Sequence, residues 1–140
     1  MPAIDSCQPQ VIRALEKDGW NVQQSPFHFA DERRSIFVDV LMIKGINGAR
    51  QQLLLTEIKC FSQMNSMTHD LYSAIGQYLI YRAMLQKTQN RIPLYLAMPH
   101  FAYEKIFDDA VMRVVHETAI NLLVVNLDTE EIVQWKPNLT

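Results

Sequence analysis

The sequence has few glycines and no strong excess of charge of either sign, and both shortages exclude classes of function. Only four of the 140 residues are glycine. Two of them, Gly45 and Gly48, lie in one predicted hairpin, so no glycine-rich loop remains that could cradle a phosphate. The formal net charge is −2, which excludes the overall basic field of proteins that coat nucleic acid. Any binding of nucleic acid must therefore depend on a local site.

Long apolar runs and metal-ligand motifs are also missing. No stretch approaches the length of a membrane span and no charged-then-apolar leader is present, so we expect a soluble, cytoplasmic protein that is not exported and contacts no membrane. The four histidines show no ligand spacing with one another or with the cysteines, which argues against a zinc site. The two cysteines, Cys7 and Cys60, lie far apart within apolar patterns, and we interpret them as reduced thiols in or near the core.

The apolar content is sufficient for one core. With 49% hydrophobic residues, we expect a single domain spanning residues 1–140. Periodicity and turn signals give the order helix, three strands, helix, strand, helix, two strands (αβββαβαββ). This order predicts an α/β fold with a central mixed β-sheet flanked by helices. The predicted helices cover residues 7–18, 70–87 and 103–118, the last with a cap for a break at 108–109, and the strands cover 20–24, 35–43, 53–61, 93–98, 121–126 and 131–135.

Two of the predicted strands carry the charges of greatest interest. Asp39 is the one charge in the otherwise apolar first strand, whereas the second strand begins as an apolar run and then alternates. Because side chains two apart on a strand point the same way, Glu57 and Lys59 share one face. Asn47-Gly48 between the strands is typical of a tight type I′ hairpin. The strands are therefore expected to pair antiparallel and to bring Asp39 close to Glu57 and Lys59.

Two carboxylates and an ammonium on adjacent strands have a clear chemical use. Asp39 and Glu57 can hold Mg²⁺ or Mn²⁺, with the backbone carbonyl of Ile58 as a further oxygen ligand. Lys59 can then orient a water or neutralise charge on a scissile phosphate. The alternative is structural, because a Glu-x-Lys pair on a strand is often solvated. A salt-bridged cluster would satisfy partly buried charges as well as a metal would.

The same residues carry a resemblance to known families. Asp39 followed by Glu57-Ile58-Lys59, with Glu16 on the preceding helix and Gln77 on the following one, resembles the pattern of the PD-(D/E)XK nuclease superfamily. Over nearly its whole length the chain is similar to the XisH family of excision controlling factors, through the segments Ala14-Leu15-Glu16-Lys17-Asp18-Gly19-Trp20, Glu57-Ile58-Lys59, Ala74-Ile75-Gly76-Gln77-Tyr78 and Glu131-Ile132-Val133-Gln134-Trp135.

The resemblance implies a fold, a site and partners. It implies a restriction-endonuclease-like core in which Asp39, Glu57 and Lys59 form the catalytic motif, with Glu16 as an accessory acid and Gln77 as a backbone or metal-water contact. Val38 stands where the superfamily motif has proline. The implied role is control of programmed excision of a DNA element, with DNA and an XisI-like companion protein as partners and a homodimer as another assembly.

Two functions from different classes remain open. One is a magnesium-dependent endodeoxyribonuclease, and the other is a regulator that keeps a nuclease fold and binds DNA or a partner without catalysis. Arg33, Arg34, Lys44 and Arg50 cluster in sequence around the hairpin. They can line an edge that binds nucleic acid, although a solvated loop is the default interpretation.

Overall fold

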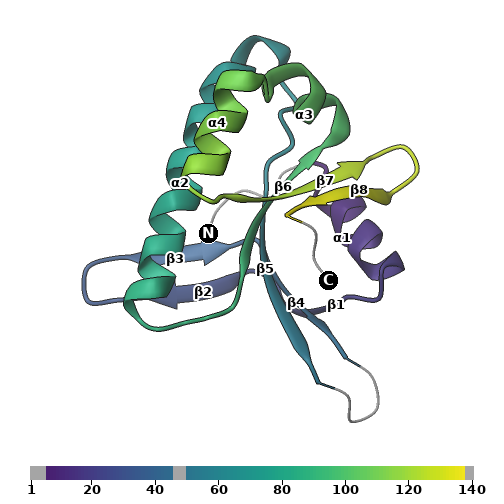
Figure 1. Cartoon of the computed structure of the whole chain (residues 1–140). Helices are drawn as coiled ribbons and strands as arrows, with labels where there is room; N and C mark the ends of the chain where they lie inside the picture. The colour runs from purple at the N-terminus through teal and green to yellow at the C-terminus, as the bar shows by residue number, and fades with distance from the viewer. Residues whose placement is uncertain (1–5, 46–49, 138–140) are drawn as a thin grey trace.

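The protein is built around a twisted six-stranded mixed sheet in the order β1-β4-β5-β6-β7-β8, with a separate two-stranded sheet, β2-β3, beside it. We describe it from a computed structural model covering residues 6–45 and 50–137 (Figure 1). The strands β5, β6 and β7 run parallel, and every other neighbouring pair is antiparallel. The predicted central mixed sheet flanked by helices is therefore confirmed.

The elements follow one another along the chain with short connections. The helices are α1 (Gln8–Lys17), a 3-10 turn η1 (Met64–Ser66), α2 (Met67–Lys87), α3 (His100–Ile106) and α4 (Asp109–Glu117). The strands are β1 (Asn21–Gln24), β2 (Phe27–Ala30), β3 (Ser35–Val38), β4 (Val40–Lys44), β5 (Gln52–Ile58), β6 (Leu94–Pro99), β7 (Asn121–Asn126) and β8 (Glu131–Lys136).

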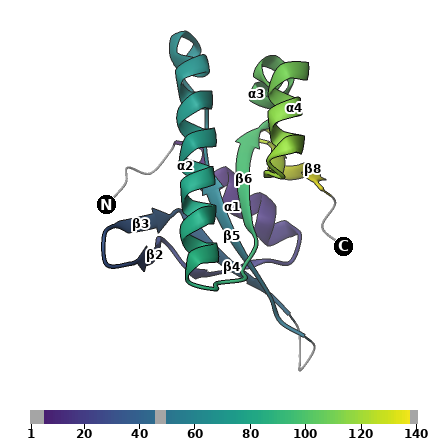
Figure 2. The same cartoon turned by 60° about the vertical axis from the view of Figure 1, so that its left-hand side comes forward.

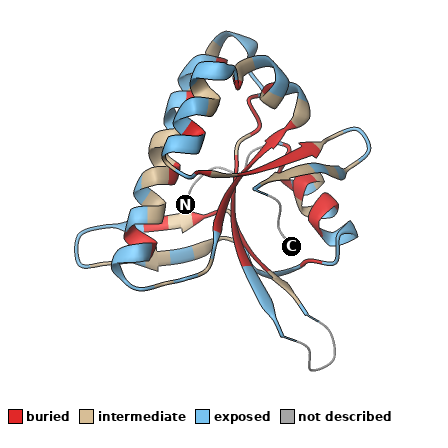
Figure 3. Cartoon of the chain, viewed as in Figure 1, coloured by how far each residue is buried: buried red, intermediate tan, exposed pale blue. Residues whose placement is uncertain are grey.

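Helices cover both faces of the large sheet (Figures 1 and 2). Alternate strand residues divide between two buried clusters, so that Leu55 packs with α2 on one face and Leu54 packs with α1 on the other. The α2 side also holds α3, α4 and the small β2-β3 sheet. Burial is concentrated along the central strands and the inward faces of the helices (Figure 3). This alternation decides which strand side chains can meet residues of α2.

The observed element order corrects the predicted one in two places. Residues 27–30 form a strand, β2, where the sequence predicted a loop, and the predicted strand 35–43 is two strands, β3 and β4, that belong to different sheets. The last predicted helix is divided into α3 and α4, at the break predicted for residues 108–109. The Asp108 side chain caps α4 by accepting a hydrogen bond from the Val111 backbone N–H. The restriction-endonuclease-like core itself stays a prediction.

A bend at Asp39 explains the division of the predicted strand. The segment that contains β1 and β2 runs antiparallel to the segment that contains β3 and β4. In the first segment β1 belongs to the large sheet and β2 to the small one, and in the second segment β4 belongs to the large sheet and β3 to the small one. At the change of sheet the Ser25 hydroxyl donates a 2.8 Å hydrogen bond to the Asp39 backbone oxygen. Asp39 thus occupies the corner where the chain passes from the small sheet into the large one.

The β4-β5 pairing is antiparallel, as predicted. Its register runs from Val40 opposite Thr56 to Lys44 opposite Gln52. The turn predicted at Asn47-Gly48 lies outside the described residues. The antiparallel pairing places the Asp39 corner beside the last residues of β5.

The prediction of reduced thiols was wrong. Cys7 and Cys60 are both buried, as expected, but they form a disulfide with a Cα–Cα distance of 5.7 Å. Their separation of 53 residues in sequence hid a proximity that arises because α1 begins over the end of β5. The disulfide ties the start of α1 to the residue that follows Lys59.

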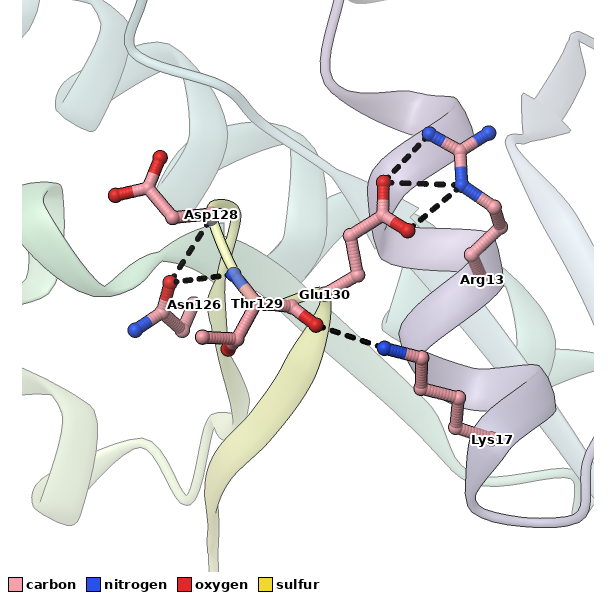
Figure 4. Close-up of polar contacts among 6 residues, drawn as sticks. All are labelled: Arg13, Lys17, Asn126, Asp128, Thr129 and Glu130. Carbon is pink, nitrogen blue, oxygen red and sulfur yellow. Dashed lines mark hydrogen bonds and ion pairs between the residues drawn. The ribbon is translucent and has the colours of Figure 1, made fainter.

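The opposite side of α1 is held by the β7-β8 turn (Figure 4). Arg13 forms a bidentate hydrogen-bonded ion pair with Glu130, and the Lys17 ammonium donates a 2.7 Å hydrogen bond to the Thr129 carbonyl. Asn126 Oδ1 accepts hydrogen bonds from the backbone N–H groups of Asp128 and Thr129 within the turn. These contacts fix α1 against the sheet from the side away from the disulfide.

Within the described parts of the chain, no helix has both the length and the apolar character required to span a membrane.

Candidate functional site

Asp39 and Glu57 lie together at the corner between the two sheets and are joined by reciprocal hydrogen bonds. The Asp39 backbone N–H donates to Glu57 Oε1 at 3.2 Å, and the Ile58 backbone N–H donates to Asp39 Oδ2 at 2.7 Å. Each carboxylate is thus fixed by the backbone of the other residue's strand segment. The sequence prediction that the hairpin brings these two acids together is confirmed.

The alternation along β5 determines where Glu57 points. Leu55 packs in the cluster beneath α2, whereas Leu54 and Ile58 pack beneath α1. Since Glu57 is two residues from Leu55, it shares the α2 face. It is only 8% exposed, and a carboxylate so nearly buried requires polar partners to remain charged.

The donor atoms present suit a hard divalent cation better than a soft one. Two carboxylates and backbone carbonyls such as that of Ile58 are oxygen ligands, which Mg²⁺ and Mn²⁺ prefer. Over residues 6–45 and 50–137, no group of three or more His, Cys, Asp or Glu side chains is arranged to hold a metal ion. A cation at Asp39 and Glu57 would therefore depend on water or a phosphate for its other ligands, which is typical of Mg²⁺.

Helix α2 places a hydrogen-bonded pair, Gln77 and Tyr81, next to the two acids. The Gln77 side-chain amide donates to the Tyr81 hydroxyl at 2.9 Å. Burial raises the pKa of Tyr81, the charges of Glu57 and Asp39 raise that pKa further, and the hydrogen bond from Gln77 lowers it. Tyr81 is thus a neutral hydroxyl within the electrostatic field of both carboxylates.

Tyr81 is a site residue that sequence reasoning did not select. Gln77 and Tyr81 are four residues apart, a spacing that puts both side chains on one face of a helix. What the spacing did not show is which sheet face that side of α2 would cover. The alternation of β5 supplies this information once the strand register is known.

Lys59 directly follows β5 and is half-buried. Its backbone N–H donates a 2.9 Å hydrogen bond to the Ala97 carbonyl, which extends the parallel pairing with β6 by one residue. Lys59 therefore keeps the direction of Glu57 at the end of the strand. The sequence prediction that the two side chains share a face agrees with this backbone arrangement.

The structure does not bring Glu16 into the same cluster. Glu16 is exposed on α1, the helix that covers the opposite face of the sheet from α2, and it acts electrostatically on Arg13. Its predicted place as an accessory acid came from the order of motifs, which does not specify the face of the sheet. Asp39, Glu57 and Ile58 are in direct contact, with Gln77 and Tyr81 beside them.

The basic residues near the predicted hairpin divide into separate places. Arg33 and Arg34 lie in the β2-β3 turn, beside the part of α2 that carries Gln77 and Tyr81. Lys44 instead lies at the end of β4, 3.6 Å from the Asp18 carboxylate and above the Trp20 ring. Lys44 therefore does not share an edge with Arg33 and Arg34, and of these three residues only the two arginines lie on the α2 side of the sheet, beside Tyr81.

Comparison with known proteins identifies the family. A family model described as XisH protein matches residues 1–133. An XisH family protein from Nostoc punctiforme is 26% identical, with a TM-score of 0.80 over 93% of this chain and 98% of that one. An fdxN element excision controlling factor protein from Anabaena variabilis is also 26% identical, with a TM-score of 0.80 over 94% and 98% of the two chains. No curated protein matches the chain. The chain, with its paired acids at the corner of two sheets, belongs to the XisH family.

Proposed function

We propose that this protein is a controlling factor for programmed excision of a DNA element, and that it has a magnesium-dependent site for hydrolysis of DNA phosphodiesters. The observation that carries the proposal is the reciprocal bonding of Asp39 and Glu57. Two carboxylates held close together by each other's backbone are preorganised for a cation that neither would bind alone. The two acids, followed by Lys59, also match the residue pattern of the PD-(D/E)XK superfamily that the sequence resembles.

Each residue of the proposed site has a distinct task. Asp39, Glu57 and the Ile58 carbonyl supply oxygen ligands for Mg²⁺ or Mn²⁺. When bound, the cation polarises the phosphate and lowers the pKa of a water. Lys59 orients the attacking water and neutralises charge that develops on the phosphate oxygens. Gln77 positions the Tyr81 hydroxyl at the border of the site, where it can donate to a phosphate oxygen.

The proposed biological role depends on a relative. The solved protein from Anabaena variabilis is described as an excision controlling factor for the fdxN element, and the two chains align along almost their full lengths. We extend that role to this protein, with DNA as the target. A single domain with net charge −2 has little electrostatic affinity for DNA, so an XisI-like companion or a second copy of the chain would supply affinity or address.

The edge strands of the large sheet indicate where such a partner would not bind. The register shifts between Val22 and Gln24 in the pairing of β1 with β4, and between Val124 and Val125 in the pairing of β7 with β8. Irregularities of this kind twist an edge strand away from regular pairing with another chain. We therefore expect the companion or second copy to bind a helical face or a loop, and not to extend the sheet.

A second candidate function is a regulator that binds DNA or a partner without catalysis. The specific observation in its favour is that the described residues supply only two clustered acids, both of which accept backbone hydrogen bonds. Those hydrogen bonds provide part of the stabilisation that partly buried carboxylates need, and they do so without a cation. In such a protein the pair would serve mainly to fix the corner between the sheets.

Incubation with supercoiled and linear DNA in Mg²⁺ or Mn²⁺ separates the two functions. The protein is assayed alone and with its companion, and Asp39→Asn serves as the site variant because asparagine keeps the shape of the side chain. We expect metal-dependent nicking by the wild type and none by the variant. Absence of nicking under all conditions, with protein that binds Mn²⁺ and is folded, would favour the regulator.

A further inference from the structure

We propose that the β2-β3 turn and the adjoining surface of α2 form a subsite for the phosphodiester backbone of the DNA strand that enters the acidic pair. This inference rests on the proposed function, because it extends the same site. Its ligand is a run of phosphates some distance along the strand from the phosphate at Asp39 and Glu57. Arg33 and Arg34 are the residues that contact them.

The subsite is an open hollow between two elements that are far apart in sequence. It has a volume of about 470 Å³ and is lined by both arginines of the turn, by the start of β3 and by one face of α2. Figures 1 and 2 both show the β2-β3 sheet beside α2. The lining residues are Arg33, Arg34, Ser35, Ile36, Gln77, Ile80 and Tyr81.

The hollow lies on the α2 side of the sheet, as the acidic pair does, and Tyr81 lies within the electrostatic field of both carboxylates. Tyr81 lines the hollow together with the arginines, and its pKa responds to the charges of Glu57 and Asp39. The strand β3 connects the same two places, since it begins beside the arginines and ends at the Asp39 corner. One nucleic-acid strand can therefore lie along β3 and contact both ends.

The two acidic residues of the turn, Asp31 and Glu32, have polar partners within the protein. Asp31 accepts hydrogen bonds from the backbone N–H groups of Arg33 and Arg34, at 2.8 and 2.9 Å. The Lys87 ammonium at the end of α2 lies 3.4 Å from Asp31 and 3.7 Å from Glu32. Lys87 thus offsets one of the two negative charges that would otherwise repel a phosphate, and the two arginines outweigh the remainder.

The two guanidinium groups remain available. Both arginines are exposed, and neither guanidinium forms a hydrogen bond or ion pair with any other residue that the structure describes. Arginine presents planar, paired donors that match phosphate oxygens. The backbone bonds to Asp31 fix the turn itself, so little backbone order has to be gained when DNA binds.

The geometry sets the expected footprint. Asp39 is five positions beyond Arg34 along extended chain, which corresponds to roughly 16 Å at about 3.3 Å per residue. Duplex DNA advances about 3.4 Å per nucleotide along its axis. Because the phosphates of one strand also wind around that axis, successive phosphates are farther apart than this rise, and the arginines therefore contact phosphates fewer than about five nucleotides from the phosphate at the acidic pair. DNA that ends closer than this on that side would lose their contribution.

The test compares DNA affinities of the wild type and Arg33→Ala/Arg34→Ala by fluorescence anisotropy on a labelled 30-base-pair duplex. Measurements use Ca²⁺ in conditions where the duplex is verified to stay intact, over a series of salt concentrations. Loss of two phosphate contacts should weaken binding at least about tenfold and reduce the slope of log K against log salt by about 2. Arg33→Lys/Arg34→Lys should restore most of the salt slope, because it keeps the charge.

A charge-matched control removes two positive charges elsewhere. Arg113→Ala/Lys136→Ala changes α4 and the end of β8, at the opposite edge of the large sheet from β1, and should leave affinity and salt slope close to those of the wild type. Circular dichroism confirms the fold of each variant. Equal losses in the control and in the arginine variant would overturn the inference, because binding would then depend on net charge alone.

The outcomes separate this inference from the proposed function. Nicking by the wild type together with unchanged affinity in Arg33→Ala/Arg34→Ala overturns the subsite and leaves hydrolysis intact. Binding that depends on the arginines, in a protein that never nicks DNA, supports the subsite and overturns hydrolysis. Truncation of the duplex provides a second readout, since affinity that does not change as the DNA is shortened through the expected footprint also overturns the subsite.

Discussion

Removal of the Cys7–Cys60 disulfide should lower the stability of the protein by an amount that follows from the length of the closed loop. The two cysteines are 53 residues apart. In the chain-entropy model a loop of this length contributes about 4 kcal/mol at 25 °C. Single domains have total unfolding free energies of roughly 5–15 kcal/mol, so the disulfide accounts for a large share. For a chain of 140 residues we expect the melting temperature to fall by about 14 °C.

The assay is urea denaturation of the wild type and of Cys7→Ala/Cys60→Ala, followed by tryptophan fluorescence and circular dichroism. The variant is preferable to a reductant alone, because both sulfur atoms are buried and a reductant would reach them only after the protein opens. Alanine also avoids placing hydroxyls in the core. Equal denaturation midpoints for the oxidised wild type and the variant would refute the reasoning, and would indicate that α1 is held mainly by its apolar face and the β7-β8 turn.

Three further predictions follow from individual contacts. Asp39→Ala should abolish Mn²⁺ binding measured by water relaxation, because Asp39 is one of the two site carboxylates. The control Glu16→Ala should retain that binding, because Glu16 lies on α1, over the opposite face of the sheet. Tyr78→Phe should cost about 1–3 kcal/mol in urea denaturation, since the buried hydroxyl accepts from one backbone N–H and donates to one carbonyl. The backbone N–H groups of the β2-β3 turn hold the pKa of Asp31 below its ordinary value. The order that Asp31 gives to this turn should therefore persist above the ordinary pKa and be lost as pH falls through the lowered one, which amide NMR titration can follow.

Local pattern was sufficient to predict most elements of the sheet. Apolar alternation located β5, and continuous apolar runs located β6 and β7, because these strands are buried on both faces. The first helix was predicted to end at residue 18, and Gly19 directly after it has a φ of +98°, which favours glycine. These features depend on neighbours in sequence, so one chain is enough to reveal them.

The features that were missed depend on contacts between distant segments. The division of residues 35–43 into two strands coincides with the Ser25 contact at the Asp39 corner, and the apolar run itself gives no sign of it. The disulfide likewise arises because α1 begins over the end of β5. In the site, the predicted antiparallel pairing of the two strands was sufficient to predict that Asp39 and Glu57 lie close together. Spacing could not predict on which face of the sheet Glu16 or Tyr81 would lie.

The rate of plasmid nicking by Lys59→Ala, relative to the wild type and to the control Lys136→Ala, tests the central claim most directly. If the site hydrolyses DNA, Lys59 assists the attacking water, and its removal should reduce metal-dependent nicking by at least about 100-fold. DNA affinity and Mn²⁺ binding should stay within about threefold of the wild type, since the affected interaction belongs to the transition state. Equal nicking rates in Lys59→Ala and the wild type would contradict the account, as would a wild type that never nicks DNA with its companion present.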